Sequence, residues 1–155
     1  MDVEARLREL GIDLPTAARP LASYVPVAVS GSFAFVSGQV PLDEGKVMVA
    51  GKLGDGVSLE EGQAATRRCA LQALAALRDE LGTLDRITKV VRVGVFVASA
   101  EGFTDQPKVS NGASDLFVEV FGEAGRHARA AVGVAELPLG APVEVEVTVE
   151  ITDPG

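Results

Sequence analysis

The sequence contains no tryptophan and only one tyrosine, one cysteine and one histidine among its 155 residues. With so few aromatic rings, the hydrophobic core must be aliphatic and built mainly from Val, Leu and Ala. The single cysteine, Cys69, excludes an intrachain disulfide, and its Ala- and Leu-rich surroundings predict a small core residue. Because His127 is the sole histidine, no histidine cluster can form, and we expect no metal site.

Basic clusters are also missing, since 14 Lys and Arg stand against 22 Asp and Glu, with a formal net charge of −8. Phosphate contacts need a clustered basic surface, so binding to nucleic acid is disfavoured. No apolar run approaches the ~20 residues that span a bilayer. The start of the chain lacks the basic-then-apolar order of a secretory signal. We therefore expect a cytoplasmic protein that binds neither nucleic acid nor membrane.

The first part of the chain alternates between helix and strand signals. Apolar residues at helical spacing predict a short amphipathic helix at 2–10, and the connector behind it completes an N-terminal segment over 1–19. Two β-rich runs within 24–40, separated by Gly31-Ser32, predict a hairpin. The glycine-rich stretch 41–57 reads as a loop with one short strand.

The rest of the chain predicts two helices and three strands. Ser58 and Glu61 fit a capping box, which predicts a long helix that ends at Gly82. The remaining expected elements are a helix from Pro107 to Gly122 and strands at 87–98, 128–135 and 143–151. Two helices on one face of a mixed sheet give a two-layer α+β domain, and we expect one domain over residues 1–155.

Residues 143–151 alternate between apolar side chains and polar ones. Glu144, Glu146 and Glu150 share one face of this predicted strand. A solvated outer face explains most of these carboxylates. A subunit interface with a polar cleft would show the same row, and one of the glutamates could then carry a proton.

Arg129 lies at the start of the apolar strand 128–135. An arginine in this position can hold a carboxylate with two parallel hydrogen bonds, a geometry that lysine cannot copy. The competing interpretation is a structural ion pair with a nearby glutamate. His127, two residues earlier, could act as a general base. For a lone histidine a structural or merely exposed role is commoner, and that is our interpretation.

The distance between Arg129 and Glu144 can be estimated from the strands. If 129–135 and 143–150 form an antiparallel hairpin, Arg129 lies opposite Glu150, and Glu144 lies ~20 Å away at the rise of a strand. The two side chains should then not meet within one chain. If both serve one ligand, they must come from different subunits.

Three segments in order resemble the Rid (YjgF) family. They are Tyr24-Val25 followed by Ser-Gly-Gln-Val-Pro at 37–41, Arg-Ala-Ala-Val-Gly-Val-Ala-Glu-Leu-Pro at 129–138, and Val-Glu-Val-Glu at 143–146. The resemblance covers about residues 20–151, and the N-terminal helix and Asn-Gly-Ala-Ser-Asp at 111–115 are similar to a longer branch of the family.

The resemblance implies a chorismate-mutase-like α+β fold and a homotrimer with ligand clefts between subunits. Active members hydrolyse reactive 2-imino or enamine acids to 2-oxo acids and ammonia, without metal or cofactor. By resemblance Arg129 holds the substrate carboxylate and Glu144 positions the attacking water. Tyr24, Ser37 and Gly38 line the cleft.

The chain departs from the active pattern where many members carry a small polar residue and then a cysteine after the arginine. Here Ala130 and Ala131 stand in those places, which changes the pocket wall. We therefore consider three functions: an imine deaminase, a binding module that captures a small carboxylate metabolite without turnover, and, less in keeping with the acidic charge, an endoribonuclease.

Overall fold

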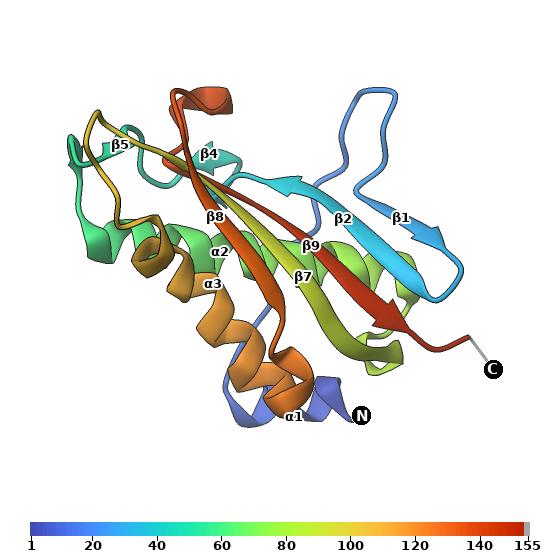
Figure 1. Ribbon diagram of the computed structural model, residues 1–155. Helices are drawn as coiled ribbons and strands as arrows, with labels where there is room; N and C mark the ends of the chain where they lie inside the picture. Colours follow the sequence, from blue (N-terminus) through green and yellow to red (C-terminus); the bar gives the residue numbers. More distant parts are fainter. Residues whose placement is uncertain (154–155) are drawn as a thin grey trace.

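A five-stranded mixed sheet with two long helices on one face forms the frame of the computed structural model, which describes residues 1–153 (Figure 1). The strands are β1 (Val27–Ser30), β2 (Phe33–Gln39), β7 (Ile87–Ala98), β8 (Ala128–Val134) and β9 (Val143–Ile151), and the helices are α2 (Leu59–Leu81) and α3 (Gln106–Phe121). The strand order is β1-β2-β9-β7-β8, with only β7 and β8 parallel. The predicted two-layer α+β architecture is confirmed.

Shorter elements complete the described chain. They are α1 (Val3–Glu9), the strand pairs β3 (Leu42–Asp43) with β4 (Lys46–Val47) and β5 (Lys52–Leu53) with β6 (Gly56–Val57), and the 3₁₀ turns η1 (Leu84–Arg86), η2 (Gly122–Gly125) and η3 (Pro138–Gly140). The segment predicted as a loop with one strand thus contains two small strand pairs. Within residues 1–153, none of the helices combines the length and apolar character needed to cross a bilayer.

The ends of α2 follow the local rules that predicted them. The Ser58 hydroxyl accepts a hydrogen bond from the Glu61 amide at 3.1 Å, and the Glu61 carboxylate accepts one from the Ser58 amide at 3.0 Å. These two bonds form the predicted capping box. Gly82 ends the helix in the left-handed conformation, with φ of 83°, which a residue without Cβ adopts at no steric cost.

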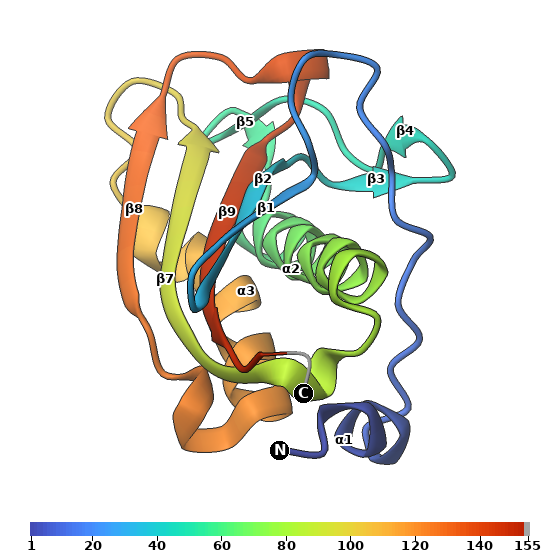
Figure 2. The same ribbon diagram turned by 90° about the vertical axis from the view of Figure 1, so that its right-hand side faces the viewer.

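The core lies between the sheet and the helices. The apolar residues of β9 at 143, 145, 147, 149 and 151 are all buried on the face that α2 covers, so the predicted alternation of this strand is confirmed. Figure 2 shows both helices on the same side of the sheet. Cys69 is buried in α2, as predicted. Among residues 1–153, no helix covers the opposite face of the sheet (Figure 2).

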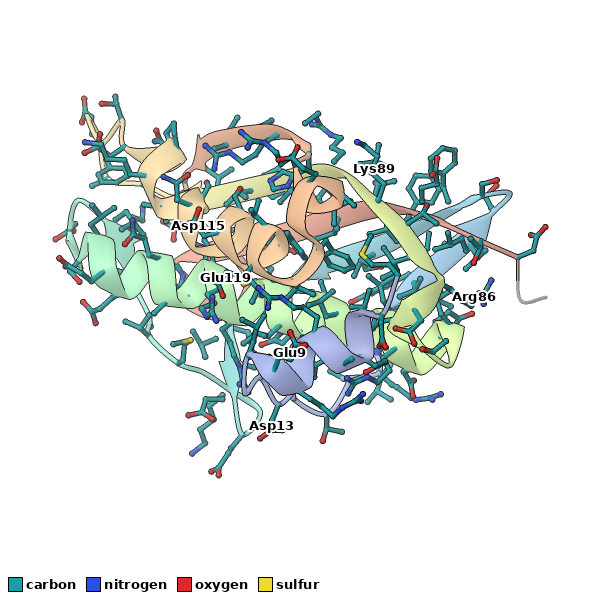
Figure 3. All side chains as sticks on the ribbon, turned by 90° about the horizontal axis from the view of Figure 1, so that it is seen from below. Glu9, Asp13, Arg86, Lys89, Asp115 and Glu119 are labelled. Atoms are coloured by element: carbon teal, nitrogen blue, oxygen red, sulfur yellow. The ribbon has the colours of Figure 1, made fainter. Side chains whose placement is uncertain are left out.

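The N-terminal helix α1 packs against α3 and against the turn η1 that follows α2 (Figure 3). Val3 and Leu7 are buried there. The Glu4 carboxylate accepts hydrogen bonds from Arg78 at 2.7 Å and from the Leu84 amide at 3.1 Å. These contacts attach the N-terminal segment to the end of α2.

The predicted hairpin between the last two strands is wrong. Strand β8 pairs in parallel with β7, and β9 lies on the other edge of β7. The reason is that alternation specifies which face of a strand is buried but not which strand lies beside it. Arg129 is level with Val93, and Glu144 is level with Phe96 on the same strand.

The new pairing changes the separation of Arg129 and Glu144 but keeps them apart. They lie two strands and three residues from each other, or roughly 10 Å across and 10 Å along the sheet. They also face opposite ways: Arg129 contacts α3, whereas Glu144 stands between the buried Val143 and Val145 and points to the uncovered face.

A close approach of α3 to α2 holds the helix layer together. Gly112 of α3 faces the backbone of α2, and a methyl group added there would overlap the Gln63 carbonyl and lie 2.5 Å from the Thr66 hydroxyl. That hydroxyl donates a hydrogen bond to the Val109 carbonyl at 2.9 Å. The position of α3, which carries part of the site described below, thus depends on a glycine.

We predict that Gly112→Ala lowers the free energy of unfolding by ~1–3 kcal/mol through overpacking against backbone. Helix propensity alone would favour alanine by ~1 kcal/mol. A lower free energy of unfolding would therefore show that overpacking outweighs helix propensity, and a higher one the reverse. Gly62→Ala on the facing helix is the matched control, with a smaller loss, because the atoms nearest its methyl would be side-chain atoms of Leu53 and Val109 and not backbone. Urea unfolding of each variant measures the difference, and a stabilised Gly112→Ala variant would contradict this packing.

Candidate functional site

Arg129 is held from one side by two neutral side chains of α3. Its Nη1 donates to the Asn111 Oδ1 at 2.9 Å and to the Ser114 Oγ at 3.1 Å. Both partners lie on the helix that packs against β7 and β8. The guanidinium is therefore fixed at one nitrogen.

The other edge of the guanidinium has no partner among residues 1–153. Neither Nε nor Nη2 of Arg129 makes a hydrogen bond there, and no carboxylate of that range forms an ion pair with it. The competing interpretation of a structural ion pair is thus not supported. An Nε and Nη2 pair is a fork that matches the two oxygens of a carboxylate.

His127 lies beside Arg129 and is bonded at both ring nitrogens. Its Nδ1 is 2.6 Å from the Gly125 carbonyl oxygen and its Nε2 is 2.9 Å from the Ser114 Oγ. Burial lowers its pKa, and the positive charge of Arg129 lowers it further, while the bond to Gly125 acts in the opposite direction. The structural role that we assigned to this histidine agrees with these contacts.

A hollow of about 670 Å³ opens next to this group. Its walls combine Arg129, His127 and Ser114 with Arg126 and the acidic α3 residues Asp115 and Glu119. Figure 3 shows Asp115 and Glu119 along α3. The hollow is large enough for a small metabolite, and Arg129 is one of its walls.

Glu144 lies on the uncovered face of the sheet, against a β-bulge in β2. The register of β2 with β9 shifts between Val36 and Gln39, which places Ser37 and Gly38 in the bulge. A methyl group on Gly38 would come within 2.9 Å of the carboxyl carbon of Glu144. The glycine therefore provides the room in which this carboxylate lies. Bulges of this kind often occur next to active sites, where they redirect a side chain.

The electrostatic surroundings of Glu144 favour its protonated form. Partial burial raises its pKa above the ordinary value of 4.5, and the negative charge of Glu146 on the same face raises it further. A carboxyl group whose pKa moves towards neutrality is better suited to take up and release a proton.

Tyr24, Ser37 and Gly38 gather at a second hollow, of about 170 Å³, between the bulge and the N-terminal connector. The Ser37 hydroxyl donates to the Val25 carbonyl at 2.6 Å. Tyr24 is 59% exposed and makes no side-chain hydrogen bond among residues 1–153. Its ring is therefore free to contact another molecule.

The predicted site residues thus form two groups. Glu144 lies against Gly38, which shares a hollow with Tyr24 and Ser37, whereas Arg129 lies on the other face of the sheet. The residues after Arg129 divide in the same way. Ala131 packs towards the core, on the Arg129 side, and Ala130 pairs with Gly94 on the uncovered face.

Sequence reasoning missed the role of Asn111 and Ser114. Both belong to the segment 111–115 that we noted only as a mark of a longer family branch. The sequence did contain a signal for their proximity. Residues three apart in a helix lie on the same face, so Asn111 and Ser114 could have been expected to act together next to the buried Ala113. Over the described range 1–153 no group of three or more His, Cys, Asp or Glu is arranged to hold a metal ion.

Comparison with known proteins gives consistent matches over nearly the whole chain. A family model described as "YjgF/chorismate mutase-like, putative endoribonuclease" matches residues 4–151. "Protein TCP17" of Trypanosoma cruzi is 51% identical over 97% of this chain and 95% of its own length. A 2-iminobutanoate/2-iminopropanoate deaminase of Dermatophagoides farinae is 30% identical over 90% of this chain and 94% of its own. The crystal structure of Atu1372, a protein with unknown function from Agrobacterium tumefaciens, has a TM-score of 0.89 and 46% identity, covering 97% and 92% of the two chains.

We predict that Glu144→Gln raises the free energy of unfolding at pH 7. The raised pKa means that the folded chain binds this proton more tightly than the unfolded chain, so ionisation above pH 4.5 destabilises the fold. The gain should vanish at a pH well below 4.5, where Glu144 is protonated in both states. Urea unfolding of both proteins across this pH range measures it.

Glu150→Gln is the control for this prediction. Its carboxylate lies on the same strand and face but accepts a hydrogen bond from the Thr88 hydroxyl at 2.8 Å, so we expect no gain. Equal gains in both variants would mean that general charge repulsion, and not the surroundings of Glu144, is responsible.

Proposed function

We propose, since the chain belongs to the YjgF/chorismate mutase-like family, that it is a hydrolytic deaminase of reactive 2-imino or enamine acids. The products are 2-oxo acids and ammonia, and no cofactor takes part. The observation that carries the proposal is the guanidinium of Arg129, which is fixed at Nη1 and has an unpaired Nε and Nη2 edge. The name of the Dermatophagoides farinae relative supports this reaction class.

Arg129 has the geometry to fix the carboxylate of the substrate. Two parallel charge-assisted hydrogen bonds determine both position and orientation, which a point charge cannot do. An imine carbon is already electrophilic, so orientation supplies much of the required catalysis. Asn111 and Ser114 hold the arginine in place before the substrate arrives.

Glu144 would act as the base and then as the acid. It takes a proton from water as the oxygen bonds to the imine carbon, and it returns this proton to the nitrogen, to which the C=N π electrons move. From the resulting carbinolamine it takes the hydroxyl proton and passes it to the amine as the C–N bond breaks, which releases ammonia and leaves the 2-oxo acid. The raised pKa of Glu144 suits both transfers.

The active cleft would lie between subunits of a homotrimer. Arg129 and Glu144 face opposite sides of one sheet, so one copy of the chain cannot aim both at the same small substrate. The uncovered sheet face also carries apolar side chains that a neighbour could bury, with Phe33 39%, Phe35 46% and Val132 45% exposed. A second copy that places its Arg129 edge near Glu144 and Tyr24 would complete the cleft.

The alternative function is a module that binds a small carboxylate metabolite without turnover, because carboxylate binding by Arg129 does not require Glu144. Measured turnover of 2-imino acids would exclude it. The endoribonuclease of the family description is less well supported. The chain has a formal net charge of −8 and one histidine, whereas RNA contacts require a positive surface.

We expect the two central residues to affect different kinetic constants. Arg129→Ala should raise KM by about 10–100-fold through the lost hydrogen bonds to the carboxylate. The KM of Arg129→Lys should lie between the values of wild type and Arg129→Ala. Glu144→Gln should lower kcat by ~10²–10⁴-fold with little change in KM. The assay generates 2-imino acids with an amino-acid oxidase and follows 2-oxo acid release. A wild-type rate no higher than the uncatalysed rate would contradict deamination, and full activity of Glu144→Gln would remove its catalytic role.

Mixed oligomers test the shared cleft. At a substrate concentration well below KM, Arg129→Ala and Glu144→Gln subunits should each keep at most about a tenth of the wild-type activity alone. Their co-expression should raise the activity to about a quarter of wild type or slightly more, because random assembly pairs two intact partners in that share of clefts. Light scattering should give the mass of a trimer. No restored activity in verified mixed trimers would place both residues in one subunit, and a stable monomer would exclude the shared site.

A further inference from the structure

His127, the one histidine of the chain, belongs to a chain of polar contacts that ends at Arg129. Its Nδ1 contacts the Gly125 carbonyl and its Nε2 contacts Ser114 Oγ, which is also bonded to Nη1 of Arg129 at 3.1 Å. The ring also packs edge-on against Phe117, with ring centres 5.9 Å apart and an interplanar angle of 83°. The imidazole is thus fixed on three sides.

The directions of these hydrogen bonds follow from the groups themselves. A carbonyl can only accept, so Nδ1 carries the proton that Gly125 accepts. A guanidinium can only donate, so Ser114 Oγ accepts from Arg129. Burial and the nearby charge of Arg129 lower the pKa of His127, which favours the neutral imidazole. In that form Nε2 carries no proton and accepts the hydrogen bond that the Ser114 hydroxyl donates.

We propose that His127 is a positioning residue for Arg129 and acts through Ser114. By accepting the hydroxyl proton of Ser114, the neutral imidazole turns a lone pair of that oxygen towards Nη1. Without this acceptor the hydroxyl rotates freely, and the guanidinium loses one of its two fixed contacts. The consequence is a less well oriented Nε and Nη2 edge. This inference rests on the proposed role of Arg129 in carboxylate binding.

Amide side chains separate positioning from packing. In His127→Gln the amide oxygen reaches the place of Nε2 and can accept from Ser114, whereas in His127→Asn the amide nitrogen can donate to Gly125 but the side chain ends before Ser114. With sodium 2-oxobutanoate as the probe in calorimetry, we expect His127→Asn and Ser114→Ala to bind about five- to tenfold more weakly, and His127→Gln within about twofold of wild type.

The double variant identifies the route of the effect. If His127 acts through Ser114, His127→Asn should weaken binding by less than about twofold in a Ser114→Ala background. Equal losses in both backgrounds, or equal losses for the Gln and Asn variants, would assign His127 to packing and overturn the proposal. If Arg129→Ala leaves the affinity unchanged, carboxylate capture by Arg129 fails, which is a failure of the proposed function itself.

A ligand-free measurement tests positioning independently of affinity. Nitrogen-15 NMR follows rotation about the Nε–Cζ bond of Arg129, which hydrogen bonds to Nη1 slow down. Rotation should be slow in wild type and His127→Gln and faster in His127→Asn and Ser114→Ala. Fast rotation in wild type, or no difference between the Gln and Asn variants, would overturn the proposal. Thermal unfolding of each variant confirms that the fold is retained.

Discussion

The period-two alternation of the sheet is the constraint on which the rest of the structure depends. The face of the sheet that packs against the helices must be apolar. Because successive side chains of a strand point to opposite faces, the position of each residue along β8 and β9 determines which face it occupies. Arg129 shares the helix face with Val93, and Glu144 is on the other face between two buried valines. Any joint action of these two residues on one small ligand therefore requires a second copy of the chain. The oligomer that we propose follows from this geometry and not only from family membership.

Local rules were sufficient to predict most elements of this fold. The capping box at Ser58, the glycine ends of the two long helices and the alternation after Val143 each depend on residues close in sequence, and each was confirmed. Strand order depends on distant pairing, and the alternation of β8 is the same whether its neighbour is β9 or β7. The hairpin prediction failed for this reason. Its conclusion that Arg129 and Glu144 lie apart still holds, because β7 lies between their strands and the two side chains point to opposite faces of the sheet.

The site was predictable to a different extent. The roles of Arg129, Glu144, Tyr24, Ser37 and Gly38 came from a family resemblance. Spacing alone left a structural ion pair open for Arg129 and a solvated face open for Glu144, and it gave no role to the other three. Contacts across 15 or more residues, such as that of Arg129 with Ser114, could not be read from the sequence. Such contacts arise only when α3 packs against the edge of the sheet. Helix parity could have placed Asn111 and Ser114 on one face, but not the arginine opposite them.

The glycines beneath the acidic face help to decide which of its carboxylates are functional. A methyl group at Gly94 would lie 2.9 Å from Cγ of Glu146, just as one at Gly38 would crowd Glu144. Glycine weakens a strand, because it adds no packing and loses more freedom on folding. A merely solvated face would not require it, since long acidic side chains can extend into water. Glu144 fits a functional interpretation better, because it is half-buried beside Gly38 and its pKa is raised, whereas Glu146 beside Gly94 is exposed. Glu150, which is bonded to Thr88, fits the structural interpretation. The row of glutamates thus divides into three cases. Glu150 is structural, Glu146 is exposed to solvent, and Glu144 has a raised pKa, so its ionisation costs stability. Glu144 is the member that lies where the proposed shared cleft would form.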